Sequence, residues 1–223
     1  MPKQVDHEGR RRQIAEAVCR LADESGLEGV TLRDVAARAQ VSMGAVQRCF
    51  RTKEEMLVFT LGSIGDEIGE RVRARLIASP AQSAATALGH AVTEVALLGE
   101  EHRAEAKVWL AFVAQAAVSP ALAGPLRRNY ALLQEAFTGL IAEARAAAPG
   151  SGSRCAPGSG SGSGSGSDAD STSGAGATPF DAEREARTVL ALADGLTAHV
   201  LIGHLTPRQA QEVLHGHLAG LWS

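Results

Sequence analysis

The segment AQVSMGAVQRCF, residues 39–50, contains the side chains with the clearest binding chemistry in this chain. Gln47 and Arg48 can each form paired hydrogen bonds with one base in the DNA major groove, glutamine with adenine and arginine with guanine. Gly44 and Ala45 are small, so a helix that carries them can approach base pairs closely in a groove about 12 Å wide. The segment therefore predicts a short helix that reads DNA.

Other groupings of reactive side chains are weaker candidates. Seven histidines suggest a metal site, but His199 and His204 are five residues apart, and His215 and His217 are two apart. Ligand pairs on one face of a helix are three or four residues apart. The sequence has no H-E-x-x-H, G-x-S-x-G, phosphate-loop or dinucleotide-binding pattern. We therefore predict no metal site, no cofactor and no catalytic residues.

Composition and charge favour a helical protein without a broadly basic surface. Aromatic residues make up 4% of the chain, and no stretch alternates β-branched residues as a strand would. The net charge is −3, with ten Lys or Arg against nine Asp or Glu in residues 1–60 and twelve against sixteen in residues 61–223. The run Arg10-Arg11-Arg12 fits either a DNA contact or a solvated helix start.

The sequence also indicates where the protein acts. It has no apolar run of 18 residues and no hydrophobic segment near its N-terminus, so we expect no membrane span, no signal peptide and a cytoplasmic location. The three cysteines, Cys19, Cys49 and Cys155, form no CxxC pair. They are expected to be reduced thiols.

Helix signals in the first third of the chain place the DNA-reading segment. Residues 9–25 have the apolar periodicity of an amphipathic helix, which Gly26 ends. Thr31 and Ser42 are N-cap residues of two short helices, and Thr52 begins an S/T-x-x-E capping box whose helix extends to about residue 77. Two short capped helices joined by a turn predict a helix-turn-helix. Its expected small core consists of Val35, Ala36, Val41, Val46 and Phe50.

The rest of the chain predicts five more helices, over about 81–98, 101–117, 120–147, 180–204 and 207–221. Gly124-Pro125 could split the third of these. Eighteen of the 28 residues 150–177 are Gly or Ser, so residues 149–179 are expected to form a flexible loop, which either tunes access to a pocket or has no role. The predicted fold is all-α, with a three-helix head (residues 9–62) and a body of about six helices (residues 63–223).

Residues 31–57, TLRDVAARAQVSMGAVQRCFRTKEEML, resemble the DNA-binding segment of the tetracycline-repressor (TetR) family of bacterial transcription regulators. With the preceding helix the resemblance covers residues 9–62, and residues 194–218 resemble the end of the ligand-binding domain in one subgroup. The resemblance implies a DNA surface made of Ser42, Met43, Gly44, Ala45, Gln47 and Arg48. It also implies that Thr31 and Lys53 hold phosphates from the starts of two helices, where free N–H groups attract anions.

The segment departs from the family pattern at two places. Gln40 stands where many members have glycine, so we expect it to adopt a left-handed conformation at a small cost. Gln47 and Cys49 stand where many members have tyrosine and histidine. Because that tyrosine usually contacts a phosphate, the assignment of Gln47 to a base rather than to the backbone stays open.

The resemblance further implies a homodimer that responds to a small molecule. Two heads would read a palindromic double-stranded operator, with recognition helices about 34–36 Å apart. The predicted dimer interface is the last two helices, about 180–221, although these could merely complete the core of one chain. Candidate residues for an effector pocket, each of which could also be plain core, are His90, Trp109, Phe112, Tyr130 and His199.

We therefore predict a ligand-responsive, homodimeric transcription regulator. A repressor is favoured over an activator because a bound dimer can block polymerase by occupancy alone. Two other classes remain as alternatives. One is a helical protein-interaction module that no longer reads DNA, and the other is an enzyme.

Overall fold

The structure is a computed structural model that describes residues 3–78, 83–147 and 180–222. Within these ranges it contains helices and no strand, as predicted. The helices are α1 (Lys3–Ser25), α2 (Leu32–Arg38), α3 (Met43–Cys49), α4 (Lys53–Ala78), α5 (Ala84–Val95), η1 (Glu100–His102), α6 (Arg103–Ala116), α7 (Pro120–Ala147), α8 (Ala182–Leu201) and α9 (Pro207–Gly220). The loop predicted at 149–179 and Cys155 lie outside the described residues.

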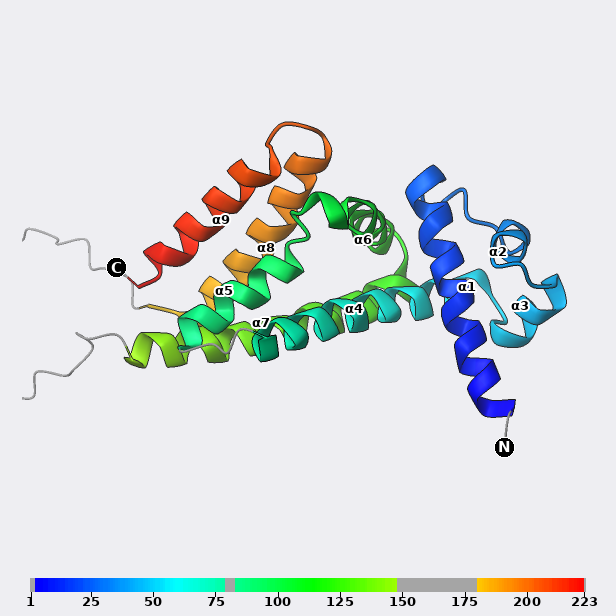
Figure 1. Cartoon of the computed structure of the whole chain (residues 1–223), viewed down its shortest axis with the longest axis horizontal. Helices are drawn as coiled ribbons and strands as arrows, with labels where there is room; N and C mark the ends of the chain where they lie inside the picture. Colours follow the sequence, from blue (N-terminus) through cyan, green and yellow to red (C-terminus); the bar gives the residue numbers. More distant parts are fainter. Residues whose placement is uncertain (1–2, 79–82, 148–179, 223) are drawn as a thin grey trace, which may run out of the picture.

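The molecule is elongated, with α1–α3 at one end and α5–α9 at the other (Figure 1). The long helix α4 leads from the head into the body, where it packs against α5 and α7. One buried cluster continues from α1, α2 and α3 through α4 to α6 and the start of α7. A second cluster lies among α5, α7, α8 and α9. The predicted boundary at residue 62 thus falls inside a helix, and no break in packing accompanies it.

The caps predicted for α2 and α3 are present. The Thr31 hydroxyl accepts a hydrogen bond from the Asp34 N–H at 3.2 Å, and the Ser42 hydroxyl accepts one from the Ala45 N–H at 3.2 Å. Such caps satisfy N–H groups that a helix start leaves unpaired. The predicted small core is also confirmed, because Val35, Ala36, Val46 and Phe50 are buried and Val41 is partly buried.

The turn between α2 and α3 is held by backbone hydrogen bonds. Gln40 has a φ of 55°, the left-handed conformation predicted for it. Its N–H bonds to the Ala37 carbonyl at 3.1 Å, and the Val41 N–H bonds to the Ala36 carbonyl at 3.0 Å. These two bonds are a Schellman motif, which ends α2 and turns the chain toward α3.

The basic run near the start of α1 is not simply solvated. The Arg11 guanidinium lies over the rings of Phe50 and Phe59, 4.7 and 4.3 Å from their centroids. Arg12 pairs with Glu8 at 2.8 Å on the same helix. Arg11 therefore fastens α1 to the chain on either side of the α4 start, through a cation–π contact.

The capping box predicted at Thr52 is present only in part. The Thr52 hydroxyl accepts from the Glu55 N–H at 3.0 Å, as expected. The Glu55 carboxylate, however, accepts from the N–H of Arg51 at 2.8 Å. The reciprocal bond thus reaches one residue further back than in the standard motif.

Several boundaries in the body differ from the prediction for local reasons. Helix α5 ends at Val95 because Leu97 has a φ of 49°, and α8 ends at Leu201 because Gly203 has a φ of 76°. Helix α7 is not split at Pro125. That residue is near the helix start, so its missing N–H removes a single backbone bond.

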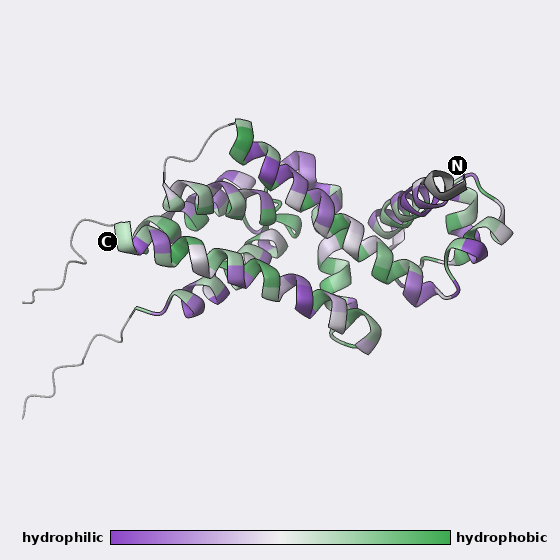
Figure 2. Ribbon diagram, turned by 90° about the horizontal axis from the view of Figure 1, so that it is seen from below, coloured by the Kyte–Doolittle hydropathy of each residue, from purple (hydrophilic) through white to green (hydrophobic). Residues whose placement is uncertain are grey.

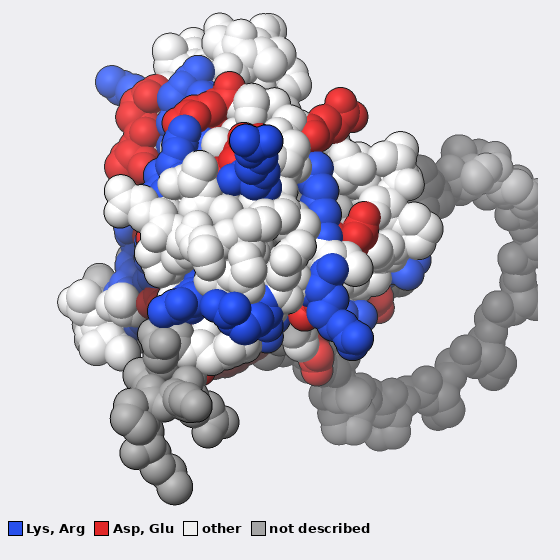
Figure 3. Space-filling view, turned by 90° about the vertical axis from the view of Figure 1, so that its right-hand side faces the viewer, with Lys and Arg blue, Asp and Glu red and all other residues white. Residues whose placement is uncertain are grey.

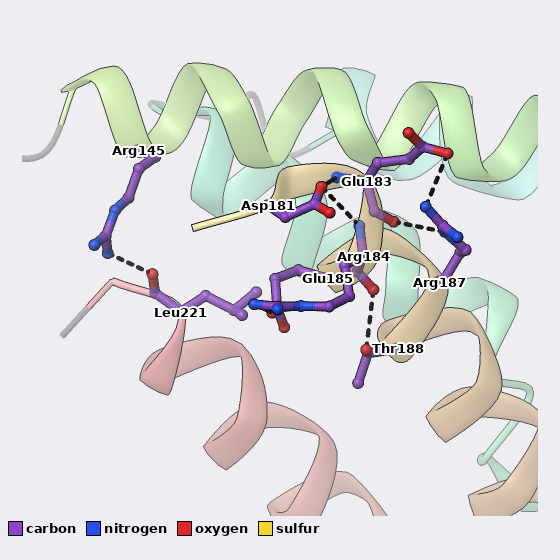
Figure 4. A network of polar contacts seen from close by, with 8 residues as sticks. All are labelled: Arg145, Asp181, Glu183, Arg184, Glu185, Arg187, Thr188 and Leu221. Atoms are coloured by element: carbon purple, nitrogen blue, oxygen red, sulfur yellow. Dashed lines mark hydrogen bonds and ion pairs between the residues drawn. The ribbon is translucent and has the colours of Figure 1, made fainter. Parts of the chain in front are cut away.

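The ends of α8 and α9 are tied by polar contacts (Figure 4). The Asp181 carboxylate accepts from the N–H groups of Glu183 and Arg184 at 3.0 and 3.2 Å, so it caps α8. The Arg145 guanidinium of α7 donates to the Leu221 carbonyl at 2.9 Å, just beyond α9. Helix α9 begins with a complete capping box between Thr206 and Gln209.

Apolar and polar residues alternate around most helices (Figure 2), as amphipathic packing requires. Among the described residues no single helix is both long and apolar enough to cross a membrane. Helices η1–α6 and α7 have the length and composition of a membrane span only when taken together, and this pair is bent by 120°.

Candidate nucleic-acid interface

Helix α3 exposes most of the residues predicted to face DNA. Gln47 and Arg48 are exposed, Met43 is 39% exposed, and Ser42 is exposed at the helix start. Ala45 differs from the prediction, because only 3% of it is exposed and it belongs to the buried side of α3. The local reason is the helical repeat, which turns Ala45, Val46 and Cys49 toward the head core. The side chain of Ala45 therefore does not reach the surface.

The Arg48 side chain lies beside Gly44. A Cβ placed on Gly44 would lie 3.7 Å from an Nη atom of Arg48, so the guanidinium folds back along α3 toward the helix start. That contact distance is ordinary, and Gly44 has no positive φ. The conformation of the backbone therefore does not require glycine at this position.

Basic residues that the sequence analysis did not select lie near α3. Arg33 on α2 and Arg51 after α3 are exposed, and neither side chain pairs with an acid among the described residues. Figure 3 shows Lys and Arg side chains, with Asp and Glu side chains among them, around a central uncharged area on this end of the molecule. The signal in the sequence that could have identified these two residues is that each lies close to a predicted helix cap. Unpaired cations around a helix with uncharged polar groups suit phosphate contacts that flank a base-reading surface.

Lys53 has a structural role that the sequence did not indicate. Its ammonium donates to the carbonyls of Leu27 and Glu28 at 3.2 and 3.3 Å. These bonds join the start of α4 to the loop after α1. An ammonium has three donors, so one remains for a phosphate.

Arg38 is not available in the same way. It forms a two-bond pair with Glu24, at 2.7 and 2.6 Å, between α2 and α1. The hydrogen bond from Arg38 lowers the pKa of the Glu24 carboxyl, and the same contact raises the pKa of Arg38. This pair fixes α2 against α1 at the surface of the head.

In the body, two of the predicted effector residues meet at one carboxylate. The Trp109 indole N–H donates to Asp194 Oδ1 at 3.1 Å, and the Tyr130 hydroxyl donates to Asp194 Oδ2. Burial raises the pKa of Asp194, while the bonds from Tyr130 and Trp109 oppose that shift. Burial and the bond to Asp194 raise the pKa of Tyr130. This trio joins α6, α7 and α8, and Asp194 is a residue that the sequence analysis missed.

No hydrogen bond among the described residues joins the other three predicted effector residues to this trio. Phe112 is fully buried in the first cluster, and His90 accepts a hydrogen bond from Arg75 at 3.2 Å beside α4. His199 is exposed on α8. Among the described residues these five candidates do not gather around one group, and which of them line an effector pocket stays a prediction.

The two histidines dismissed on helical spacing are neighbours in space. The rings of His199 and His204 have centroids 4.9 Å apart. They come together although they are five residues apart in sequence, because α8 ends at Leu201 and the chain turns back at Gly203. Among the described residues, no group of three or more His, Cys, Asp or Glu side chains could hold a metal ion.

Two family descriptions match this chain. Residues 14–58 match "Bacterial regulatory proteins, tetR family", which covers α2, α3 and most of α1. Residues 84–156 and 168–223 match "BetI-type transcriptional repressor, C-terminal". Together the two matches include most of the head and most of the body.

Proteins of similar sequence include HTH-type transcriptional regulators. The chain is 33% identical to the HTH-type transcriptional regulator BetI of Serratia proteamaculans over 156 residues, 67% of this chain and 79% of that protein. It is 36% identical to the HTH-type transcriptional regulator PksA of Bacillus subtilis over 118 residues, 52% of this chain and 56% of that protein.

Solved structures of similar proteins share the fold. A transcriptional regulator from Rhodococcus sp. Rha1 has a TM-score of 0.72 and 27% identity, and the match covers 95% of both chains. A transcriptional regulator from Saccharomonospora viridis in complex with choline has a TM-score of 0.73 and 19% identity over 95% of this chain and 96% of that one. The second likeness concerns the fold alone.

Proposed function

Because the chain belongs to the TetR family of bacterial regulatory proteins, we propose that it is a homodimeric repressor that a small molecule releases from a palindromic operator. The family consists of transcription regulators that bind DNA, and the body matches the BetI-type repressor description. The proposed target, chromosomal DNA, implies action in the cytoplasm.

The observation that supports sequence-specific DNA binding is the exposed face of α3. Gln47 and Arg48 extend from a helix fixed by the Ser42 cap, and neither side chain bonds to another described residue. Gln47 is assigned to an adenine edge and Arg48 to guanine O6 and N7. Ser42, Met43 and Gly44 approach the groove beside them. Thr31, Lys53, Arg33 and Arg51 are assigned to phosphates.

Dimerisation is supported by the outer faces of α8 and α9. Ala191, Gly195 and His199 are exposed four residues apart on α8, and Ile202 beyond them is 77% exposed. On α9, Val213 and Gly216 are exposed. Small and apolar residues on two adjacent helices let two copies pack closely as a four-helix bundle.

The response to a small molecule is supported by the trio Trp109, Tyr130 and Asp194. A carboxylate between two aromatic side chains attracts a cationic ligand, through its charge and the ring faces. The structural neighbour from Saccharomonospora viridis binds choline, a quaternary ammonium ion. The effector must favour the arrangement of heads that does not fit the operator, since otherwise DNA is not released.

Selection of genomic DNA fragments at physiological salt tests the DNA-binding proposal, with a Gln47→Ala, Arg48→Ala protein as the matched control. We expect the parent protein alone to recover fragments that share one palindromic site, because non-specific binding is strongly salt-dependent. Recovery of the same fragments by both proteins, or of none by either, would reject base reading by α3. The protein-interaction alternative would then lead.

A second experiment tests the dimer. Ile202→Glu places a charge on the proposed interface, whereas Val118→Glu changes an equally exposed apolar residue, also 77% exposed, after α6. Sedimentation should show a dimer for the parent and for Val118→Glu, and a shift toward monomer for Ile202→Glu. A dimer that both variants leave intact would place the interface elsewhere.

A further inference from the structure

Two histidine side chains lie against each other at the turn between α8 and α9 (Figure 1). His199 belongs to the last turn of α8, and His204 lies in the turn that leads to α9. Both residues are exposed, and neither imidazole forms a hydrogen bond or an ion pair with another described residue. Their ring nitrogens are therefore available to a ligand from solvent. We call these two side chains the histidine pair.

The backbone of the turn holds the histidine pair in place. The N–H groups of His204 and Leu205 both donate to the His199 carbonyl, at 2.9 and 3.2 Å. The Gly203 N–H donates to the Val200 carbonyl at 3.0 Å, and Gly203 has a φ of 76°. Glycine adopts this conformation without steric cost. The two side chains are thus brought together by backbone bonds that do not depend on contact between the rings.

The distance between the rings fits two imidazoles bound to one metal ion. A zinc–imidazole bond is about 2.0–2.1 Å long, and the bound nitrogen lies about 1.1 Å from the centre of its ring. Two imidazoles at adjacent positions of an octahedral or a tetrahedral ion therefore have ring centroids about 4.4–5.2 Å apart. The centroids of His199 and His204 are 4.9 Å apart.

The inclination of the two rings is also compatible with a shared ion. The ring planes are inclined at 62°, and each metal-bound imidazole can turn about its own metal–nitrogen bond. Aromatic contact alone also gives centroid distances of about 4.5–7 Å. The test of a metal site therefore needs a measurement that counts nitrogen ligands.

Charged groups near the turn do not prevent metal binding. Arg103 of α6 donates to the Leu201 carbonyl at 3.2 Å, and Arg208 in the first turn of α9 pairs with Glu212 at 2.9 Å. Neutral imidazole nitrogens bind transition metal ions by coordination, so the site needs no net negative charge. The carbonyl groups at the C-terminal end of α8 also favour a cation there.

We propose that the histidine pair binds one divalent transition metal ion per chain, of the class that prefers imidazole ligands, namely Cu²⁺, Ni²⁺ or Zn²⁺. His199 and His204 each supply one nitrogen. Among the described residues no group of three or more His, Cys, Asp or Glu side chains could hold a metal ion, so water occupies the other coordination positions. Mg²⁺ and Ca²⁺, which take oxygen ligands, do not bind here.

The ion would join the end of α8 to the turn before α9. A ligand that binds only the folded chain stabilises it by mass action. His199 also lies on the face proposed for dimerisation, but the site takes both protein ligands from one chain. The inference therefore does not rest on the proposed function.

The test uses the untagged full-length protein in the oligomeric state that it adopts in solution. Isothermal titration calorimetry with Ni²⁺ measures affinity and stoichiometry, and electron paramagnetic resonance of bound Cu²⁺ counts the nitrogen ligands. The variants are His199→Gln and His204→Gln. His7→Gln is the matched control, because His7 is an exposed histidine of α1.

We expect one Ni²⁺ per chain in the parent protein. Either variant of the histidine pair should weaken Ni²⁺ binding at least about tenfold, since even the loss of a group that only orients a metal ligand costs about 10–100-fold. His7→Gln should leave the affinity nearly unchanged. Bound Cu²⁺ should show two imidazole nitrogens in the parent and one in each variant of the pair. Equal affinity in the parent and both variants, or a single nitrogen ligand in the parent, would overturn the proposal.

Thermal unfolding provides a second readout. Ni²⁺ at a free concentration about a hundred times its Kd should raise the Tm of the parent by about 5–10 °C, because it binds the folded chain alone. The same concentration of Ni²⁺ should give a much smaller rise in His204→Gln, and Mg²⁺ should give none in the parent. Without metal, parent and variant should unfold at nearly the same temperature, because both side chains are exposed. An equal rise with Ni²⁺ in parent and variant would place the bound ion elsewhere.

Discussion

In α3 the side chains of Gln47 and Arg48 are exposed and bond to no other described residue, whereas in the body Trp109, Tyr130 and Asp194 bond to one another across three helices. DNA that meets α3 displaces only water. A ligand that enters the trio must break hydrogen bonds that set the positions of helices. One polar surface is thus free of internal contacts, whereas the other is coupled to the packing of the body, where the proposed conformational response would begin.

The largest expected effect tests whether head and body share one core. Phe112 is 0% exposed in the cluster that continues from α1 to α6. Phe112→Ala should lower the free energy of unfolding by about 3–5 kcal/mol, because it leaves a cavity. Urea denaturation followed by circular dichroism measures it. Leu132→Ala, at a 67% exposed site of α7, should change it by less than about 0.5 kcal/mol. A separate transition for the head would break the assumption of a shared core.

The next largest expected effect is on operator binding by the exposed face of α3. Arg48→Ala should weaken operator binding by about 1–3 kcal/mol, the value of one good base contact, and leave the melting temperature unchanged. Arg127→Ala removes the same charge from an exposed site of α7 and should affect neither quantity strongly. Fluorescence anisotropy at fixed salt measures the affinity. A lower melting temperature for Arg48→Ala would show that α3 residues also support the fold.

A pH experiment sharpens the contrast between the two regions. Burial raises the pKa of Asp194 from about 3.8. The stability that the protonated Asp194 carboxyl contributes to the fold is therefore lost as pH rises from that value through the raised pKa. Relative to Asp194→Asn, the parent should lose stability with rising pH, at no more than about 1.4 kcal/mol per unit for one proton. Urea denaturation between pH 4 and 7 measures this difference.

Glu24 provides the opposite sign for the same experiment. Its pKa is lowered by Arg38, so it contributes stability above its ordinary pKa that is lost as pH falls. Relative to Glu24→Gln, the parent should therefore lose stability toward acid. Equal slopes for the two variant pairs would contradict the assignment of a buried body carboxyl and a paired surface carboxyl.

Lys53 bonds within the protein and is also proposed to contact DNA, and a substitution can separate these two roles. Lys53→Met removes the donor to the Leu27 and Glu28 carbonyls and should cost about 1 kcal/mol of stability. If Lys53 also contacts a phosphate, the slope of log affinity against log salt falls by about 0.9. Arg33→Met should change only that slope, because Arg33 has no partner among the described residues. Measured stabilities and salt series decide between the roles.

The smallest expected effect lies at the turn before α3. Gln40→Gly should stabilise the head by about 0.5 kcal/mol, since glycine adopts a positive φ without the steric cost but loses more entropy on folding. Gln40→Ala keeps the steric cost and should give no gain. Thermal unfolding measures both. A destabilised glycine variant would show that the Gln40 side chain makes a contribution that outweighs the strain.

Features that depend on a few neighbouring residues could be predicted from the sequence. The caps at Thr31 and Ser42 and the left-handed Gln40 are examples, because each is fixed by bonds within about five residues. The burial of Ala45 also follows from the helical repeat. It was nevertheless predicted to be exposed, because the family resemblance places this position at the DNA surface. The DNA contacts themselves remain a prediction.

Features that depend on packing could not be predicted. Asp194 was missed because its partners Trp109 and Tyr130 are 85 and 64 residues away in sequence. Lys53 was assigned to DNA alone because the carbonyls that it holds are 25 and 26 residues away. The spacing rule for His199 and His204 failed because it assumes a helix that Gly203 ends.

The turn between α2 and α3 is held by backbone bonds, and α3 is held by its buried side, so Gln47 and Arg48 contribute almost nothing to folding. If α3 reads the operator as proposed, replacing them would change which operator is recognised without destabilising the fold. Under the proposed function, a duplicated gene for this protein would acquire a new set of target promoters through one or two substitutions, while its body would keep the proposed response to the original small molecule.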